Sequence, residues 1–288
     1  MTPVLDTALI MLIAGVLSFL PFRYWTALRL GPRIDPDTVR SEVRRHPRLA
    51  AAATRRLEPS TLTGLALTVS GALVVAGAAL FGLIFFMIRG HFGFADFDVS
   101  LARFAARHAT HGATTVLRIF TQLGGAVVLV PLTFVVWLVF GRRRGLKTSL
   151  AFLLLTVGGQ FALADLVKWI VDRTRPNFDR LTGFSGPSFP SGHATASACC
   201  LAAFALLIGA GRSTWVQALL ASAAVALAAG IASSRVFLGV HWFTDVIGGL
   251  TLGWTWFTVC SIAFSGRLLD FGRPVEQMEQ TVKTELLR

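Results

Sequence analysis

Seven long apolar stretches limit what this chain can fold into more than any other feature of its sequence. They lie at roughly residues 4–22, 62–88, 119–140, 148–168, 193–210, 216–233 and 242–265. About 20 apolar residues in a helix cross ~30 Å of hydrocarbon, and a helix satisfies its own backbone hydrogen bonds there. The pattern therefore predicts an all-α fold, a polytopic membrane helical bundle. The stretch 193–210 is short and rich in Ala and Cys, which indicates close helix packing.

The charge balance helps to decide whether nucleic acid or lipid is the partner of this chain. Only 15% of the residues are charged, and 27 Lys and Arg outnumber 15 Asp and Glu to give a net charge of +12. In a soluble chain such an excess would favour nucleic acid binding. In a chain this apolar it is typical of cytoplasmic loops that contact anionic lipid. We therefore expect the lipid bilayer as a partner and no nucleic acid, and the oligomeric state stays open.

Basic residues gather in alternate segments between the apolar stretches, which predicts the orientation of the chain. Residues 23–60 contain nine Arg, and residues 141–147 contain four basic residues and no acid. The positive-inside rule puts both segments in the cytoplasm. No positive charge precedes the first stretch, so we expect an uncleaved helix with its amino end outside. Segments 89–118, 169–192 and 234–241 then lie on the outer side.

These assignments divide the chain into an N-terminal transmembrane helix (1–22), a basic cytoplasmic linker (23–61), a membrane core (62–266) and a cytoplasmic tail (267–288). The Arg-rich and Ala-rich composition is typical of a bacterial inner membrane protein. The outer segment 94–118 has apolar residues at helical spacing, which predicts an amphipathic helix on the bilayer surface. Cys199, Cys200 and Cys260 lie inside apolar stretches. We expect no disulfide and no metal site from them.

Three short motifs stand at the ends of apolar stretches on the predicted outer side. They are Lys168-(six residues)-Arg175-Pro176, Pro190-Ser191-Gly192-His193 and Ser234-Arg235-(five residues)-His241-(three residues)-Asp245. Taken singly, each has an ordinary explanation: a cation that snorkels to the interface, a Ser-capped helix, or a His beside a capping acid. Together they bring three cations, two imidazoles and one carboxylate to one membrane face. This set suits the binding of a phosphate and the cleavage of its ester bond without a metal.

The cations and the second motif are suited to holding phosphate oxygens. Arg175 and Arg235 offer planar forks that match two oxygens at once, and Lys168 offers a movable point charge. If helix 148–168 continues past the membrane, Lys168 and Arg175 share one of its faces. Ser191 and Gly192 precede an apolar run and predict a helix N-terminus whose free N–H groups receive an anion.

The third motif supplies a candidate nucleophile. His241 and Asp245 stand four residues apart where the last helix should begin, so they share a face and can touch. A carboxylate that holds one ring nitrogen leaves the other nitrogen free to attack phosphorus. An acid that enters a membrane helix is costly unless it is paired, which favours a functional pair here.

The three motifs resemble the signature of the type 2 phosphatidic acid phosphatase superfamily, in its integral membrane branch, whose phosphate pocket is shared with vanadium haloperoxidases. The resemblance covers roughly residues 62–266 and implies a six-helix phosphatase core with residues 1–22 as an extra transmembrane helix. It implies that His241 attacks to form a phosphohistidine, that Asp245 orients it, and that His193 serves as general acid and then as base. The implied phosphate ligands are Lys168, Arg175, Ser191, Gly192 and Arg235, with no metal and no cofactor.

The expected substrate is a membrane lipid phosphate or diphosphate: undecaprenyl diphosphate, phosphatidylglycerol phosphate, phosphatidic acid or a lipid A phosphate. The sequence does not separate these candidates. Two other classes stay open. A vanadate-dependent haloperoxidase would use the same pocket, but those relatives are soluble. A non-catalytic lipid-phosphate binder or flippase would keep the cations without needing the His241–Asp245 pair.

Overall fold

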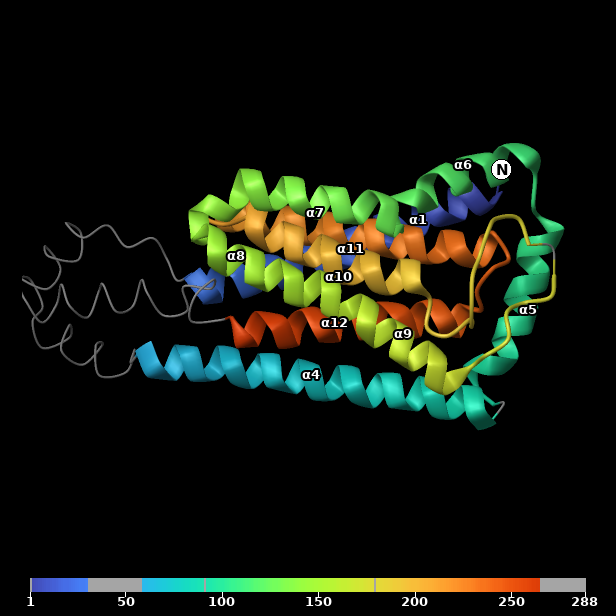
Figure 1. Ribbon diagram of the computed structural model, residues 1–288, viewed down its shortest axis with the longest axis horizontal. Coiled ribbons are helices and arrows are strands. Elements are labelled where there is room, and N and C mark those ends of the chain that lie inside the picture. Colours follow the sequence, from blue (N-terminus) through green and yellow to red (C-terminus); the bar gives the residue numbers. More distant parts are fainter. Residues whose placement is uncertain (1, 31–58, 91, 179, 265–288) are drawn as a thin grey trace, which may run out of the picture.

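The computed structural model describes residues 2–30, 59–90, 92–178 and 180–264, and all regular secondary structure within these ranges is helical (Figure 1). The elements are α1 (Thr2–Leu30), α4 (Pro59–Gly90), α5 (Phe94–Arg107), α6 (His111–Thr121), η1 (Gln122–Gly124), α7 (Ala126–Phe140), η2 (Gly141–Arg144), α8 (Leu146–Leu153), η3 (Leu154–Gly158), α9 (Gly159–Val171), α10 (Gly192–Ile208), α11 (Thr214–Phe237) and α12 (Phe243–Ala263). The predicted all-α fold is confirmed. Most of the predicted linker and all of the predicted tail lie outside the described residues.

Five helices in the described part of the chain are long and apolar enough to cross a membrane. They are Pro3–Arg23, Thr68–Gly90, Leu146–Val171, Thr214–Phe237 and Phe243–Ala263. His111–Gly124 and Ala126–Phe140, bent by 44°, form a sixth span if they cross together, and Gly192–Ile208 is apolar but shorter. Each predicted apolar stretch is therefore helical, and the predicted polytopic bundle is confirmed.

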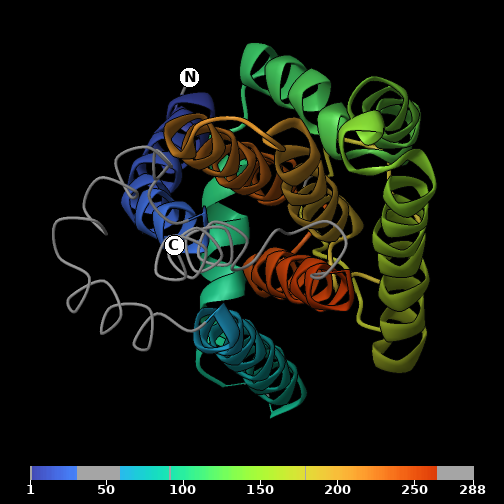
Figure 2. The same ribbon diagram turned by 90° about the vertical axis from the view of Figure 1, so that its left-hand side faces the viewer.

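Helices α10, α11 and α12 form the centre of the bundle (Figure 2). Helix α1 packs along α11, α4 packs along α12, and α7 and α9 contact α10. The largest buried apolar cluster joins α7, α8 and α10 through side chains such as Leu129, Phe152 and Phe204. Only 12% of the apolar window of α1 and 11% of that of α4 are buried. These two helices therefore present most of their surface to lipid.

Two glycines of α12 bring its first turns close to those of α10. A Cβ atom on Gly253 would lie 2.4 Å from the carbonyl oxygen of Thr195. A Cβ atom on Gly249 would lie 2.8 Å from the carbonyl oxygen of Ser191. Such distances are far below van der Waals contact, so only glycine permits this approach. As a consequence, the N-termini of α10 and α12 meet at one end of the bundle.

At the same end of the bundle, the structure differs from two predictions made from the sequence. Helix α9 ends at Val171 because Asp172 adopts a left-handed conformation with φ of 44°. Arg175 therefore lies in the loop of residues 172–191, and the prediction that it shares a helix face with Lys168 is wrong. The segment 94–118 is also not one helix. It breaks after α5, and the Thr110 side chain caps α6 by accepting a hydrogen bond from the Ala113 amide at 3.3 Å.

Helix α5 lies across the ends of the longer helices (Figure 1). Its Ala102 and Ala105 are buried, as is Asp98, whereas Phe97 and Phe104 are exposed. One face of α5 therefore packs on the bundle, and the predicted contact of its other face with the bilayer surface stays a prediction.

Candidate active site

His241 lies between α11 and α12, and its two ring nitrogens have different partners. Nδ1 lies 3.4 Å from Oδ2 of Asp245, so the two side chains meet as their spacing predicts. Nε2 lies 3.0 Å from a guanidinium nitrogen of Arg175. A guanidinium can only donate, which makes Nε2 the acceptor and leaves the ring proton on Nδ1, facing the carboxylate. This tautomer directs the Nε2 lone pair towards the cations of the site.

The carboxylate of Asp245 is held from several sides. Oδ2 accepts hydrogen bonds from the backbone amide of Trp242 at 2.8 Å and from the hydroxyl of Ser188. Oδ1 accepts from Arg173 at 2.6 Å. Asp245 is fully buried. Its orientation, and through it that of His241, is therefore fixed by groups from both the loop and the helix.

Burial and charge keep the His241 ring neutral. Burial lowers its pKa from 6.5 to about 4; Asp245 opposes the shift, and the charges of Arg175 and Arg235 add to it. At neutral pH the imidazole is therefore unprotonated, which is the state that a nucleophile needs.

The N-terminus of α10 forms a second side of the site. Ser191 is the N-cap of α10, yet its hydroxyl does not cap the helix and has no hydrogen-bond partner among the described residues. A Cβ atom on Gly192 would lie 3.5 Å from the Lys168 ammonium, so this cation reaches the helix N-terminus from α9. An unpartnered buried hydroxyl, free backbone N–H groups and an ammonium together make a site for an anion.

His193 follows in the first turn of α10 and points towards a turn that the sequence analysis did not include. Its Nε2 lies 3.5 Å from the position of a Cβ atom on Gly125, directly after η1. The charges of Arg235, His241, Lys168 and Arg175 all act on His193. The imidazole is thus surrounded by the other residues of the three motifs.

The two arginines of the motifs are placed differently. Arg235 is buried on α11; its Nη1 donates to Thr121 at 3.4 Å, and its Nε has no partner among the described residues. Arg175 donates to the carbonyl oxygens of Val240, Ser185, Gly186 and Pro187 at 2.8–3.1 Å. Burial lowers the pKa of Arg175, Asp245 opposes the shift, and Arg180 adds to it. Of these two arginines, Arg235 is therefore the one that has a buried donor without a partner among the described residues.

All eight predicted site residues lie at this end of the bundle: Lys168, Arg175, Ser191, Gly192, His193, Arg235, His241 and Asp245. Sequence reasoning missed Arg173 and Ser188, which contact Asp245, and Asp98 and Thr244, which contact Arg173. Arg173 stands inside the six-residue spacer of the first motif, two residues before Arg175. A cation there was a visible signal, but nothing in the sequence pointed to its partners.

Comparison with known proteins connects this geometry to a family. Residues 149–268, which contain all three motifs, match the family model described as PAP2 superfamily. The chain belongs to the PAP2 superfamily. It is thus a member of the family that the motifs resemble.

Several PAP2-type relatives are similar over this region. Phosphatidylglycerophosphatase B of Bacillus subtilis (strain 168) is 36% identical over 137 residues, which are 46% of this chain and 66% of that protein. Undecaprenyl-diphosphatase of Sulfolobus acidocaldarius is 29% identical over 171 residues, which are 57% and 73% of the two chains. Lipid A 1-phosphatase of Rhizobium etli is 37% identical over 119 residues, which are 38% and 47%. The matched region is thus 47% to 73% of these relatives' lengths.

A solved structure supports the PAP2 fold across more of the chain. The crystal structure of a transmembrane PAP2 type phosphatidylglycerolphosphate phosphatase from Bacillus subtilis superposes with a TM-score of 0.63 at 27% identity. The alignment covers 69% of this chain and 98% of that one. The helical bundle of this chain is therefore the membrane PAP2 fold.

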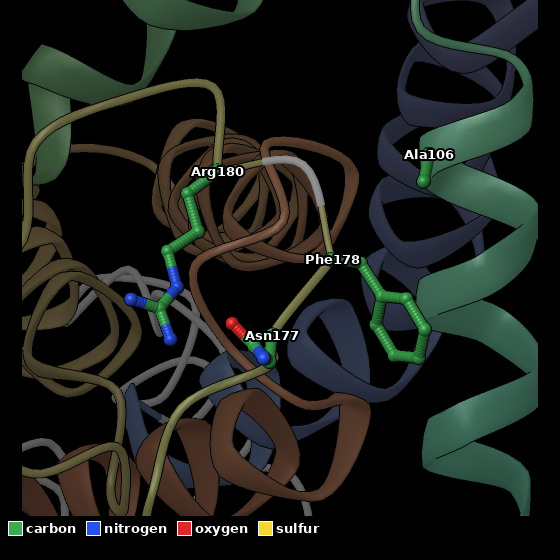
Figure 3. A pocket seen from close by; sticks show the side chains of 4 residues that line it. All are labelled: Ala106, Asn177, Phe178 and Arg180. Atoms are coloured by element: carbon green, nitrogen blue, oxygen red, sulfur yellow. The ribbon is translucent and has the colours of Figure 1, made fainter.

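A pocket of about 510 Å³ opens beside the PAP2 motifs (Figure 3). Ala106, Asn177, Phe178 and Arg180 line this outer pocket. The Arg180 guanidinium lies 4.8 Å from the centroid of the Phe184 ring, and that of Arg175 lies 5.2 Å from the same centroid. The outer pocket therefore adjoins the arginine that contacts His241. Among the described residues, no three His, Cys, Asp or Glu side chains gather closely enough to hold a metal ion.

Proposed function

We propose that this chain hydrolyses a phosphate monoester or diphosphate of a membrane lipid through a covalent phosphohistidine on His241. The observation that carries the proposal is the neutral His241 ring, held by Asp245 through Nδ1, with Nε2 directed at Arg175. The names of the relatives reported above are all those of lipid phosphatases, which supports the proposal.

In the first chemical step, Nε2 of His241 attacks phosphorus and the bond from phosphorus to the lipid oxygen breaks. His193, which the negative charge of the bound phosphate keeps protonated, donates its proton to the departing oxygen. Arg175, now without its contact to Nε2, turns to the phosphoryl oxygens together with Arg235 and Lys168. The Ser191 hydroxyl and the amide of Gly192 complete the set of donors that stabilise charge on these oxygens.

In the second step, the same groups release inorganic phosphate. His193 takes a proton from water, and the water oxygen attacks the phosphohistidine. The bond between nitrogen and phosphorus breaks, which returns His241 to its neutral form. Asp245 keeps the proton on Nδ1 throughout and stabilises the positive ring that exists between the two steps.

The substrate enters from the bilayer, so that its head group lies in the outer pocket. Arg180 lies close enough to affect Arg175, and Asn177 adds an amide group. These groups suit an anionic or sugar-containing head group beyond the scissile phosphate. Undecaprenyl diphosphate and phosphatidylglycerol phosphate carry a second phosphate and lipid A phosphates carry sugars, whereas phosphatidic acid has neither.

A panel of these four lipids in detergent tests the proposal. We expect phosphate release that survives EDTA and is blocked by vanadate, because cations and imidazoles bind the phosphate. The matched control is His241→Ala, which keeps the cations. Activity that disappears with EDTA and returns with magnesium would refute the mechanism. Lipid binding without phosphate release by the unaltered chain would favour a binder or flippase.

We also propose that the chain lies in a bacterial inner membrane with the site on the periplasmic or extracellular side. The bundle end with the site also carries α5, whereas the α7–α8 turn with basic Arg142 lies at the opposite end (Figure 1). The positive-inside rule puts that turn in the cytoplasm.

Thiol labelling tests this orientation. In a background without Cys199, Cys200 and Cys260, Thr182→Cys should react with an impermeant reagent in intact spheroplasts. Lys147→Cys should react only after permeabilisation. The reverse pattern would place the site in the cytoplasm and exclude outer-leaflet substrates, while leaving the chemistry intact.

A further inference from the structure

The geometry points to Asp98 and Arg173 as positioning residues that hold Asp245 and set the net charge beside His241. Neither residue belongs to the three motifs. The inference rests on the proposed function, because it concerns how the nucleophile is kept ready for attack.

Arg173 joins two carboxylates. Its Nη1 donates to Oδ1 of Asp245 at 2.6 Å and to the hydroxyl of Thr244 at 2.8 Å. Its Nη2 donates to Oδ2 of Asp98 at 2.8 Å. The guanidinium also lies over the Trp242 ring, 5.6 Å from its centroid. Planar contacts in two directions fix the guanidinium in one orientation, which a flexible ammonium would not reproduce.

Asp98 connects Arg173 to the first turn of α12 by hydrogen bonds. Its Oδ1 accepts from the backbone amide of Thr244 at 2.8 Å, and its Oδ2 accepts from the Thr244 hydroxyl at 2.5 Å. Helix α5 is thus joined to the first turn of α12 by the hydrogen bonds of one carboxylate, beside the contact between the Phe97 and Phe243 rings. Asp98 is 1% exposed and Asp245 is 0% exposed, so water does not screen either charge.

Every contact of Asp98 is with a donor, which suits the ionised carboxylate. Burial raises the pKa of Asp98, whereas hydrogen bonds from the Thr244 hydroxyl and amide and from Arg173 oppose the shift. Placing a carboxylate here is therefore unfavourable by itself, and the structure offsets it with three hydrogen bonds. A purely structural link between α5 and α12 would not need a charge.

The charges of the network explain what it does for His241. Two carboxylates share one guanidinium, which leaves one net negative charge beside the ring. That charge stabilises the positive ring formed after attack. Without Asp98, the whole charge of Arg173 would act on Asp245 and weaken its pull on the Nδ1 proton. Without Arg173, two buried carboxylates would face each other, and Asp245 would lose the contact that orients it.

Opposite pH shifts in two variants distinguish this role from a structural one. The acid limb of kcat/KM marks protonation of His241, because an imidazolium has no lone pair for attack. Asp98→Asn removes a negative charge, so the limb should move to lower pH. Arg173→Gln removes a positive charge, so the limb should move to higher pH. The double variant should return the limb close to its original position.

The catalytic constants should fall as well. We expect kcat to fall roughly 10-fold in Asp98→Asn and roughly 100-fold in Arg173→Gln, with KM within about 2-fold, because misplaced reacting groups lower the rate of the chemical step. Arg173→Lys keeps the positive charge, so the acid limb should stay at the pH of the unaltered chain. Its kcat should remain below that of the unaltered chain. Arg175, Arg235 and His193 also act on His241 from the loop, α11 and α10, and Lys168 on α9 acts on His193. All four residues are unchanged in all variants.

The matched controls are Asp6→Asn on α1 and Arg107→Gln at the end of α5, which should keep the original kinetics and limb. Unaltered kcat and limb in Asp98→Asn and Arg173→Gln would overturn the inference. Loss of kcat without any shift of the limb would also overturn it, because that is the result of a structural role. Absence of phosphate release by the unaltered chain would instead contradict the proposed function itself.

Discussion

The loop between α9 and α10 and the helix α11 each bring one arginine to the site. Arg175 on the loop donates to four backbone carbonyls and to His241. Arg235 on the helix has one long hydrogen bond to Thr121 and a buried Nε without a partner among the described residues. The loop arginine thus builds the site and contacts the nucleophile, whereas the helix arginine keeps donors for a ligand.

The difference follows from how the two regions are held. Helices α10, α11 and α12 are fixed by close packing, although Asp245 on α12 is also held by the loop residues Arg173 and Ser188. The described residues of loop 172–191 have no regular secondary structure, and the loop depends on side-chain contacts such as those of Arg173 and Arg175. Polar groups in a loop of this kind must find partners within the protein. The site residues on α10 and α11 are therefore positioned without the loop, whereas Arg175 and Asp245 depend on it.

The largest effects should come from the two histidines, His193 on α10 and His241 beside the loop arginine Arg175. His241→Ala should abolish turnover, because nothing replaces the nucleophile. His193→Ala should lower turnover by ~10²–10⁴-fold, the usual effect of losing a general acid. A substrate with a good leaving group should partly rescue the first step in His193→Ala only, measured as single-turnover release of that leaving group. Equal rescue of both variants would mean that their roles are wrongly assigned.

A smaller effect should separate the two arginines directly. Arg235→Lys should lower kcat by roughly 10²–10³-fold, because a point charge cannot donate along two directions to the phosphoryl group. Trypsin cleavage after Arg180 should stay as in the unaltered chain. Arg175→Lys should lower kcat and also accelerate that cleavage, since the carbonyls of the loop lose their donors.

Arg142→Lys at the other end of the bundle is the control for both measurements. Near-normal kinetics in Arg235→Lys and Arg175→Lys would mean that the two arginines serve only as anchors at the membrane interface. Equal trypsin sensitivity of the two variants would remove the contrast between loop and helix.

The smallest effect is expected at the outer pocket. Arg180→Ala should raise KM several-fold for lipids with large anionic head groups and leave kcat within about 2-fold, because binding outside the reacting centre is lost equally in the ground and transition states. Initial rates over a range of phosphatidylglycerol phosphate and phosphatidic acid concentrations measure this change. A uniform loss of kcat with both lipids would instead place Arg180 with the loop's structural arginines.

Some features of this protein could be predicted from its sequence and others could not, for physical reasons. Apolar length predicts the helices because lipid admits few alternatives. The spacing of His241 and Asp245 predicts their contact because it spans about one helical turn. The end of α9 was not predictable, since it depends on the left-handed conformation of one residue, Asp172. Nor was the contact of Asp98 with Thr244, 146 residues away, because no local pattern encodes it.

The glycines of α12 also have a consequence for stabilising the protein by design. Replacing glycine in a helix by alanine commonly adds about 1 kcal/mol of stability in water. At Gly253 the added methyl group would meet the Thr195 carbonyl, which belongs to the backbone and cannot rotate away. At Gly82 on α4 it would meet nothing within 4 Å. A helix can therefore be stabilised by alanine on the outer surface of the bundle, but not where the backbones of α10 and α12 approach each other.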